Sequence, residues 1–265
     1  MSVSPPPIAS LQNALVKKIR KLHHTKYRHQ EQLCLLEGTH LVAEAIAASY
    51  PLVTVCCTPS WQARYPQMWE QIDRQAHRAT IVTDSVMNAL ATTIQPDGVV
   101  AVAPSKPATP IPLPQSGLGL ALETVRDPGN LGTIMRSAAA AGVEGLWVSA
   151  DSADLDHPKV LRASAGAWFR LPLTVSPDLP EVARQCRQQG IPVFATSAQA
   201  DTTYWEIDWC RPSLVLLGNE GAGLSPELAN LADRSIRIPM TNETESLNVA
   251  LSAALIAYEA YRQRG

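Results

Sequence analysis

The chain alternates between short apolar runs and segments with helical spacing. In the first hundred or so residues, the runs "LVTVCC", "ATIVT" and "GVVAVA" are separated by helical patterns such as "THLVAEAIAAS". Short β-branched runs are typical of buried strands, and their alternation with helices is typical of α/β folds. We therefore expect a small α/β domain in the N-terminal part of the chain.

The same alternation is stronger in the second half. Apolar runs predict strands near residues 118–125, 145–149, 171–175, 191–196, 213–218 and 235–240, with helical segments between them. Strands of this kind are buried on both faces, so the pattern predicts a mostly parallel sheet covered by helices on both sides. Ligands of such sheets bind beyond the carboxyl ends of the strands, and the loops there are the first place to look for chemistry.

The two halves are separated by "APSKPATPIPLPQSG", residues 103–117, which holds five prolines and shows no periodicity. Proline-rich segments form stiff, extended linkers. We predict an N-terminal domain over residues 1–104, a linker over 105–117 and a C-terminal domain over 118–265. A chain of 265 residues, 46% of them hydrophobic, is long enough to build two such cores.

Composition argues against several classes of protein. No apolar run approaches the roughly 20 residues of a membrane helix, and the polar, proline-rich start "MSVSPPPIAS" differs from a signal peptide, so we expect a cytoplasmic protein. The five cysteines, at positions 34, 56, 57, 186 and 210, show neither C-x-x-C spacing nor a matching histidine pattern. This argues against a disulfide framework and a zinc site, and we expect buried thiols and no metal.

Charge is distributed unevenly, although the net charge is only -2. Residues 1–117 carry ten Lys and Arg against seven Asp and Glu, and the remainder carries twelve against seventeen. Residues 1–30 contain no carboxylate, and their cations gather near Tyr27. Such a cluster suits the phosphate backbone of RNA, but the solvated face of an N-terminal helix explains it equally well. The candidate RNA contacts there are Lys17, Lys18, Arg20, Lys21 and Arg28.

The first candidate loop follows the first strand of the C-terminal domain, where "RDPGN" leads into the helical pattern "LGTIMRSAAAA". We expect Asn130 to cap this helix and Gly142 to end it. A helix N-terminus offers free N–H groups and a partial positive charge to an anion, and Gly129 and Gly132 let a ligand approach the backbone. The helix dipole disfavours Arg136 in the second turn by about 1 kcal/mol or less unless an anion neutralises it. A solvated arginine is the alternative.

A second loop, "NEGAGLSPEL", follows the apolar strand "LVLLG". Its glycines predict a crowded backbone turn, and Ser225 and Pro226 predict the N-cap and the first residue of a new helix. Glu220 stands between the glycines at the end of a strand. That position favours a functional role over the role of a solvated loop residue.

A third loop, "TNETESLN", leads into the alanine-rich helix "VALSAALIAYEAYRQR". We expect Ser246 to cap that helix. Asn248 then lies one turn inside it, where asparagine has a poor propensity and no obvious structural duty, so it is the better functional candidate. A further segment, "HPKVLRASAGAWF", offers Lys159 and Arg162 as phosphate contacts or as ordinary surface residues.

Together, "NLGTIMR", "LLGNEGAGLS" and "IPMTNETESLNVALSAALIAYE", in this order, closely resemble the three motifs of the SpoU (TrmH-like) RNA methyltransferases of the SPOUT superfamily. The resemblance covers residues 118–265, and "KYRHQEQLCLLEGTHLVAEAI" is similar to the substrate-binding domain of that family. It implies a C-terminal, mostly parallel sheet with a trefoil knot, a rare exception to unknotted topology. It also implies a small α/β RNA-binding domain before that sheet, and a homodimer.

The resemblance implies a function as well. Members of the family transfer a methyl group from S-adenosyl-L-methionine to a ribose 2′-hydroxyl of RNA, and a separate N-terminal domain favours ribosomal RNA over transfer RNA. The family's catalytic positions fall here on Asn130, Arg136, Glu220, Ser246 and Asn248. Its cofactor-binding positions fall on Thr196, Gly218, Asn219, Gly221, Ile238, Met240 and Leu247.

Other interpretations stay open. One is a transfer RNA 2′-O-methyltransferase, and another is a non-catalytic RNA-binding protein with a vestigial cofactor pocket, against which three intact motifs argue. A nucleotide-dependent enzyme with a doubly wound sheet is disfavoured, because the chain has neither a G-x-G-x-x-G fingerprint nor a Walker sequence.

Overall fold

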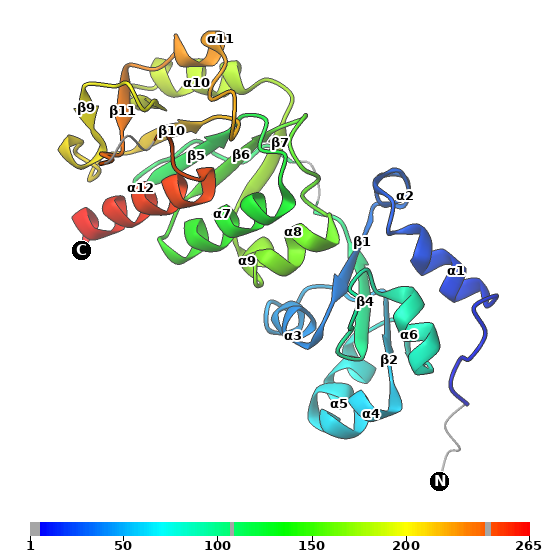
Figure 1. Ribbon diagram of the computed structural model, residues 1–265. Coiled ribbons are helices and arrows are strands. Elements are labelled where there is room, and N and C mark those ends of the chain that lie inside the picture. Colours follow the sequence, from blue (N-terminus) through cyan, green and yellow to red (C-terminus); the bar gives the residue numbers. More distant parts are fainter. Residues whose placement is uncertain (1–5, 107–108, 242–244) are drawn as a thin grey trace. The chain divides into compact units, whose positions relative to one another are not determined.

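In this computed structural model the chain forms two compact units (Figure 1). The structure describes residues 6–106, 109–241 and 245–265. The first unit comprises Met1–Pro107 and Asp154–Phe169, and the second comprises Ala108–Ala153 and Arg170–Gly265. The segment Asp154–Phe169 therefore belongs to the first unit, although it lies within the C-terminal half of the sequence.

Within the described residues, the first unit contains a four-stranded sheet in the order β1-β4-β2-β3. Its strands are β1 (Leu33–Glu37), β2 (Thr54–Cys57), β3 (Ala79–Ile81) and β4 (Val99–Pro104). β4 runs antiparallel to β1 and β2, whereas β2 and β3 are parallel. The predicted strands of this half are confirmed, and β1 is an additional strand that the apolar pattern does not single out.

Helices pack around this first sheet. They are α1 (Ala14–Lys21), α2 (Thr25–Glu31), α3 (Thr39–Ala47), α4 (Pro59–Arg64), α5 (Pro66–Gln75) and α6 (Asp84–Leu90). α1 contacts α6, and the apolar core between them includes Val16, Ile19, Leu22, Met87 and Leu90. Val16 and Ile19, three residues apart, are the buried residues of α1, so one face of this helix is buried and its cations occupy the other.

Two short helices of the segment Asp154–Phe169 complete the first unit: α8 (Pro158–Ala163) and α9 (Ala167–Arg170). α8 contacts β1. The indole of Trp168 is fully buried and meets the ring of Tyr50 edge-on, with the ring centroids 5.3 Å apart. Burial of this large aromatic side chain holds the segment against the first sheet.

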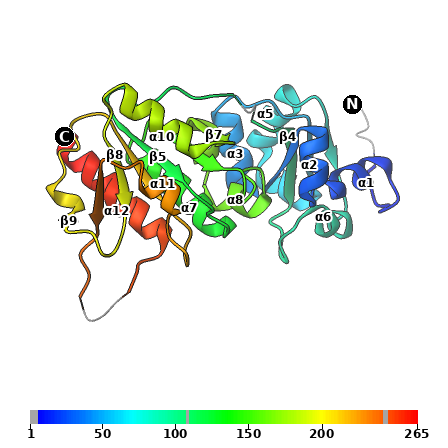
Figure 2. The same ribbon diagram turned by 90° about the horizontal axis from the view of Figure 1, so that it is seen from above.

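The second unit is built on a parallel sheet. In the part of the chain that the structure describes, it has seven strands in the order β7-β6-β5-β10-β8-β11-β9, and each neighbouring pair is parallel. The strands are β5 (Leu118–Leu122), β6 (Gly145–Ser149), β7 (Leu173–Ser176), β8 (Val193–Thr196), β9 (Thr202–Thr203), β10 (Ser213–Leu217) and β11 (Arg234–Arg237). Figure 2 shows β9 at the edge opposite β7. Each predicted strand of this half is confirmed, and β9 is added to them.

Helices cover both faces of the second sheet, as predicted (Figure 1). α7 (Pro128–Ala140) and α12 (Val249–Arg264) pack against each other on one face, while α10 (Leu179–Gln188) and α11 (Pro226–Ala229) lie on the other. A one-turn 3-10 helix, η1 (Tyr204–Glu206), follows β9. The loop between β11 and α12 includes residues 242–244, which lie outside the described residues, so the trefoil knot stays a prediction.

Among the described residues, no helix has the length and apolar character needed to cross a bilayer. Over the same residues, His, Cys, Asp and Glu side chains form no group of three that could hold a metal ion. Four cysteines are buried but Cys210 is exposed, so the expectation of five buried thiols is wrong at that position. Burial raises the pKa of the Cys56 and Cys57 thiols to about 12, which keeps both protonated and unreactive.

Candidate functional site

Three elements of the second unit meet beyond the carboxyl ends of its strands, and side-chain hydrogen bonds join them. Asn248 Nδ2 donates to Asn130 Oδ1 at 3.0 Å, and Asn130 Nδ2 donates to Glu220 Oε1 at 2.9 Å. These residues belong to the loop before α12, the first turn of α7 and the loop after β10. The structure thus brings together three of the five predicted catalytic residues, and we call Asn248, Asn130 and Glu220 the polar triad.

The cap of α7 differs from the prediction. The helix begins at Pro128, and its N-cap is Asp127, whose side chain accepts from Asn130 N at 2.9 Å. Asn130 is therefore the third helical residue and not the cap. Proline is favoured at the first helical position, which is why the chain starts the helix there. The carboxamide of Asn130 is left to bridge Asn248 and Glu220. The predicted end of this helix at Gly142, with a φ of 70°, is confirmed.

The cap of α12 also differs from the prediction. Its N-cap is Asn248, whose Oδ1 accepts from Ala250 N at 2.9 Å and from Leu251 N at 3.3 Å. Ser246 does not cap the helix, and Asn248 does not lie inside it. Asparagine is as good a cap as serine, so the first residue able to cap is not necessarily the one used. The amide of Asn248 both caps α12 and contacts Asn130.

Arg136 stands apart from the polar triad. It is exposed on α7 and has no hydrogen-bond or ion-pair partner among the residues that the structure describes. Six residues after Asn130, it leaves the helix in a direction roughly 120° away from that of Asn130. The structure therefore presents its guanidinium to solvent with all of its donors available.

A pocket of about 580 Å³ lies among the loops that follow β8, β10 and β11. Its volume falls within the range of about 300–1,000 Å³ found for small-molecule sites. It is lined by each residue predicted to bind the cofactor, namely Thr196, Gly218, Asn219, Gly221, Ile238, Met240 and Leu247. Glu220 and Ser246 line it too, so the pocket and the polar triad share Glu220.

Sequence reasoning missed several polar residues of this pocket. Gln199, Arg237, Glu245 and Ser252 also line it. Gln199 and Arg237 follow or end the parallel strands β8 and β11, and the rule that ligands bind at carboxyl ends would have singled them out. Glu245 and Ser252 flank the start of α12, and neither belongs to a pattern that marks a binding residue.

The loop after β10 is tightly closed. Asn219 Oδ1 accepts from Gly221 N and Ala222 N, both at 3.0 Å, and the backbones of Asn219 and Gly223 exchange two hydrogen bonds of 3.0 Å. A Cβ at Gly218 would overlap the backbone of Gly223, so only glycine fits at that position. The closed loop gives Glu220 a fixed backbone from which to reach Asn130.

The end of β5 holds this loop from the other side, through residues that sequence reasoning did not single out. Glu123 accepts from Ser225 Oγ and from Ser225 N, both at 2.6 Å. Ser225 caps α11, as predicted. The carbonyl of Thr124 accepts from Asn219 Nδ2 at 2.9 Å. The two ends of the loop are therefore bound to the two residues that directly follow the neighbouring strand β5.

A basic helix stands in the first unit. Asn13 caps α1, and Lys17, Lys18, Arg20 and Lys21 lie exposed on it. Lys18 Nζ lies 3.7 Å from Glu31 Oε2, an ion pair open to solvent. The arrangement agrees equally with a solvated helix face and with an RNA contact.

Arg28 is a correction to the predicted basic cluster, because its side chain is fully buried. Its guanidinium bonds Asp154 Oδ2 at 2.6 and 3.1 Å, and it also donates to the carbonyls of Leu22 and His23 and to the hydroxyl of Thr25. Every nitrogen of this guanidinium therefore has a partner inside the protein. Arg28 fastens the segment Asp154–Phe169 to α2 and has no donor left for RNA.

Arg162, a second predicted phosphate contact, also has an internal partner. Its Nη1 lies 2.8 Å from Glu37 Oε2, and the Glu37 side chain is only 3% exposed. An arginine that neutralises a buried carboxylate is costly to divert to another anion. Lys159 is exposed on α8.

Both units are similar to known proteins. The sequence model of the SpoU rRNA Methylase family matches residues 117–258, and that of the MRM3-like substrate binding domain matches residues 13–101. An uncharacterized tRNA/rRNA methyltransferase from Synechocystis sp. is 44% identical over 257 residues, which cover 97% of this chain and 94% of the relative. RlmP of Bacillus subtilis, a 23S rRNA (guanosine(2553)-2′-O)-methyltransferase, is 31% identical over 256 residues, which cover 95% of this chain and 97% of the relative.

A solved structure agrees with the same assignment. The SpoU methyltransferase AviRb from Streptomyces viridochromogenes, crystallised in complex with AdoMet, matches with a TM-score of 0.86 at 30% sequence identity. The match covers 96% of this chain and 98% of that one. The likeness therefore extends over both units.

Proposed function

Because this chain belongs to the SpoU rRNA methylase family, we propose that it is an S-adenosylmethionine-dependent methyltransferase acting on a ribose 2′-hydroxyl of ribosomal RNA. The observation that carries the proposal is the pocket beside the polar triad, which is lined by every residue that the motifs assign to the cofactor. Two relatives that match along nearly the whole chain support an RNA substrate, and one of them, RlmP, is a 23S rRNA enzyme. This substrate implies a cytoplasmic location.

The residues of the pocket fit S-adenosylmethionine. Ile238, Met240 and Leu247 supply apolar surface for an adenine ring, and Thr196 supplies a hydroxyl. The glycines of the loop after β10 let a ligand approach the backbone closely. When bound, the cofactor supplies a methyl group on a positively charged sulfur. The protein must hold that group in line with the attacking oxygen and keep competing water out.

Arg136 is proposed to act on the RNA. A guanidinium keeps its proton in proteins, so Arg136 is not the base that removes the 2′-hydroxyl proton. As an exposed cation without an internal partner, it is suited to bind the phosphate beside the target ribose and to stabilise the negative charge that develops on the attacking oxygen. Asn248 and Asn130 would orient the third member of the polar triad, Glu220, at the same site. Ser246 would contact the ribose or the cofactor.

Substitution of Arg136 tests this assignment. Arg136→Ala is expected to abolish methyl transfer and to leave S-adenosylmethionine affinity, measured by calorimetry, nearly unchanged. Arg136→Lys keeps the charge but loses the planar fork, so it should recover only part of the rate. Transfer of a tritiated methyl group to ribosomal RNA is the assay. A fully active alanine variant would contradict the role given to Arg136.

The proposed enzyme is a homodimer formed through α12. Leu251, Leu255 and Tyr258 are 56%, 41% and 49% exposed and recur at a spacing of four and three residues, so they form an apolar stripe on one face of the helix. An apolar stripe of this kind is typical of a surface that a partner covers. A second copy of the chain is the occupant that we propose, in a symmetric contact.

We favour ribosomal RNA over transfer RNA as the substrate for two reasons. The first unit matches a substrate-binding domain, and it carries the exposed cations of α1. Purified protein should methylate ribosomal RNA from cells that lack the gene, and mapping would identify the nucleotide. Methylation of transfer RNA alone would establish the alternative substrate. Absence of S-adenosylmethionine binding in calorimetry would instead indicate a non-catalytic RNA-binding protein.

A further inference from the structure

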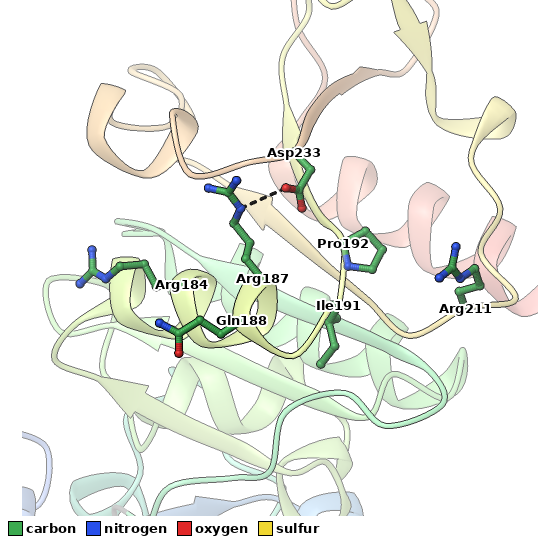
Figure 3. A pocket seen from close by; sticks show the side chains of 8 residues that line it. Arg184, Arg187, Gln188, Ile191, Pro192, Arg211 and Asp233 are labelled. Carbon is green, nitrogen blue, oxygen red and sulfur yellow. Dashed lines mark ion pairs between the residues drawn. The ribbon is translucent and has the colours of Figure 1, made fainter.

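A second hollow lies at the amino ends of the strands in the second unit, at the edge opposite the cofactor pocket. Its volume is about 600 Å³. α10 contributes Arg184 and Arg187, the residues before β10 contribute Arg211, and the residue before β11 contributes Asp233 (Figure 3). We call these three arginines and the space between them the arginine hollow. None of its residues belongs to the three motifs.

Arginine is the only basic residue type in the second unit. Residues 108–153 and 170–265 contain no lysine. Arginine carries five N–H donors in a planar fork that matches two oxygens of a phosphate, and its charge is permanent. Three of these arginines gather at one hollow in a half of the chain that is acidic overall. Asp233 pairs with Arg187, and Glu181 and Asp178 pair with Arg184, so the hollow offers guanidinium donors without a net positive charge.

Arg187 is held in position for such a contact. Its Nε lies 3.0 Å from Asp233 Oδ1, and Asp233 Oδ2 in turn accepts from Val193 N at 2.9 Å. The carboxylate is thus anchored to the first residue of β8. The guanidinium is turned toward it in an ion pair that is open to solvent (Figure 3). The two Nη groups make no hydrogen bond with any residue of 6–106, 109–241 and 245–265. Their donors are available to a ligand.

The other two arginines are also accessible. Arg211 is exposed, and its side chain makes no hydrogen bond or ion pair with any described residue. Arg184 is 41% exposed and lies 3.0 Å from Glu181 Oε2 and 3.6 Å from Asp178 Oδ2. Ion pairs open to solvent in this way are weak, so a phosphate can take the place of these carboxylates.

From these contacts we propose that the arginine hollow binds the phosphodiester backbone of RNA. In Figure 3 the three arginines do not converge on one point, but are spread along α10 and across to the start of β10. Such a spread fits successive phosphates of one strand better than a single anion. The inference rests on the proposed function, because it gives the RNA substrate a second contact on the catalytic unit, away from the pocket where the methyl group is transferred.

The test is RNA binding by the full-length protein, measured as the fluorescence anisotropy of a labelled 20-nucleotide single-stranded RNA over a range of salt concentrations. Loss of one phosphate contact lowers the slope of log affinity against log salt by about 0.7 for a single strand. Arg211→Ala should show that decrease, and Arg211→Lys, which keeps the charge, should largely restore the slope. Arg74→Ala, at an exposed arginine of α5 in the first unit, is the matched control and should keep the wild-type slope.

Three results would overturn the inference. The first is an equal salt slope for Arg211→Ala and the wild type, and the second is an equal effect of the Arg211→Ala and Arg74→Ala substitutions. The third is displacement of the RNA by inorganic phosphate at the same total concentration of phosphate groups as in the RNA, which would indicate a site for a single anion. The proposed function is tested separately by methyl transfer and S-adenosylmethionine affinity. A wild-type protein that binds RNA through Arg211 but methylates none would overturn the proposed function and leave the arginine hollow in place.

Discussion

Asn248 allows the polar triad to be tested apart from the stability of α12, because the two ends of its amide do different work. Oδ1 accepts the backbone N–H groups of Ala250 and Leu251 and caps the helix, while Nδ2 donates to Asn130. Asn248→Asp keeps the capping acceptor and removes the donor. Asn248→Ala removes both, so the pair of variants separates the two bonds.

The expected magnitudes differ between stability and rate. Aspartate caps as well as asparagine and gains about 0.3–1 kcal/mol from the helix dipole, so Asn248→Asp should be at least as stable as the wild type. Asn248→Ala loses a cap, which costs about 0.5–2 kcal/mol. In the aspartate variant Asn130 must turn its nitrogen toward position 248, and Glu220 Oε1 loses the donor that Asn130 supplies. A hydrogen bond to a charged group contributes about 1.5–3 kcal/mol, so methyl transfer should slow by roughly 10- to 150-fold.

The assay is the initial rate of methyl transfer to ribosomal RNA with both substrates saturating, accompanied by thermal unfolding of each variant. We expect the aspartate variant to be slow and fully stable, and the alanine variant to be slow and less stable. A wild-type rate for Asn248→Asp would refute the role of the triad. A rate loss matched by the same fall in melting temperature as in Asn248→Ala would assign the effect to the cap.

Other predictions follow from contacts that the motifs do not include. Glu123→Ala removes both oxygens that accept from Ser225 N and Ser225 Oγ, so S-adenosylmethionine affinity, measured by calorimetry, should fall about tenfold or more; unchanged affinity would show that the loop keeps its shape without this contact. Arg28→Met removes the main partner of Asp154, whose side chain is only 13% exposed and keeps the exposed His29 at 3.5 Å as an ionisable partner, and should cost about 3–5 kcal/mol in denaturant unfolding, against no more than about 1 kcal/mol for an exposed pair. Burial by itself raises the pKa of Asp154, but its hydrogen bonds, first of all from Arg28, hold it below the usual value. The stability from this pair is therefore complete above the unfolded pKa of about 3.9 and is lost as pH falls through the lower folded value. Leu255→Glu should convert the proposed dimer to a monomer in sedimentation velocity, and a persisting dimer would place the interface elsewhere.

The position of the site could be predicted because parallel strands point their carboxyl ends the same way. Once the apolar runs were assigned to one parallel sheet, the loops after β8, β10 and β11 had to lie at a common edge. The residues predicted to bind the cofactor therefore line one pocket, although Thr196 and Leu247 are far apart in the sequence. Their assignment to the cofactor came from the motifs and stays a prediction.

The caps could not be assigned with the same security, because neighbouring residues compete for them. Asp127 and Asn130 are both good N-caps, and the signal that distinguishes them is Pro128 at the first helical position. Ser246 and Asn248 offer no such signal. Asn248 caps α12 and also donates to Asn130, a contact across 118 positions of the chain that a local pattern does not reveal.

The pattern of apolar and polar residues could not predict long-range partners of charged residues. Arg28 sits in a run of cations and looks like its neighbours, yet its carboxylate partner lies 126 residues away in the segment Asp154–Phe169. Helical periodicity identifies the face of a residue but not a partner from another part of the chain. Glu123 is a similar case, since its contact with Ser225 joins the end of one strand to the loop after another.

The direction of the hydrogen bonds in the polar triad explains why its residues are two amides and a carboxylate. Asn248 must turn its oxygen toward the N–H groups of α12, so its nitrogen is the end that meets Asn130. Asn130 then accepts with its oxygen and donates with its nitrogen, and the next member must accept. An ionised Glu220 can only accept, so it is the last member of the series and fixes both amide orientations, which the heavy atoms of an amide alone do not define.

The variant Glu220→Gln tests this order. Asn219 donates to Glu220 Oε2 at 3.3 Å, so the carboxylate accepts from Asn130 with one oxygen and from Asn219 with the other. A glutamine has only one oxygen, and if that oxygen accepts from Asn130, its N–H groups face the N–H groups of Asn219. This isosteric variant should therefore lose methyl transfer while its melting temperature stays near that of the wild type, and a wild-type rate would show that the charge of Glu220 is not needed to order the site.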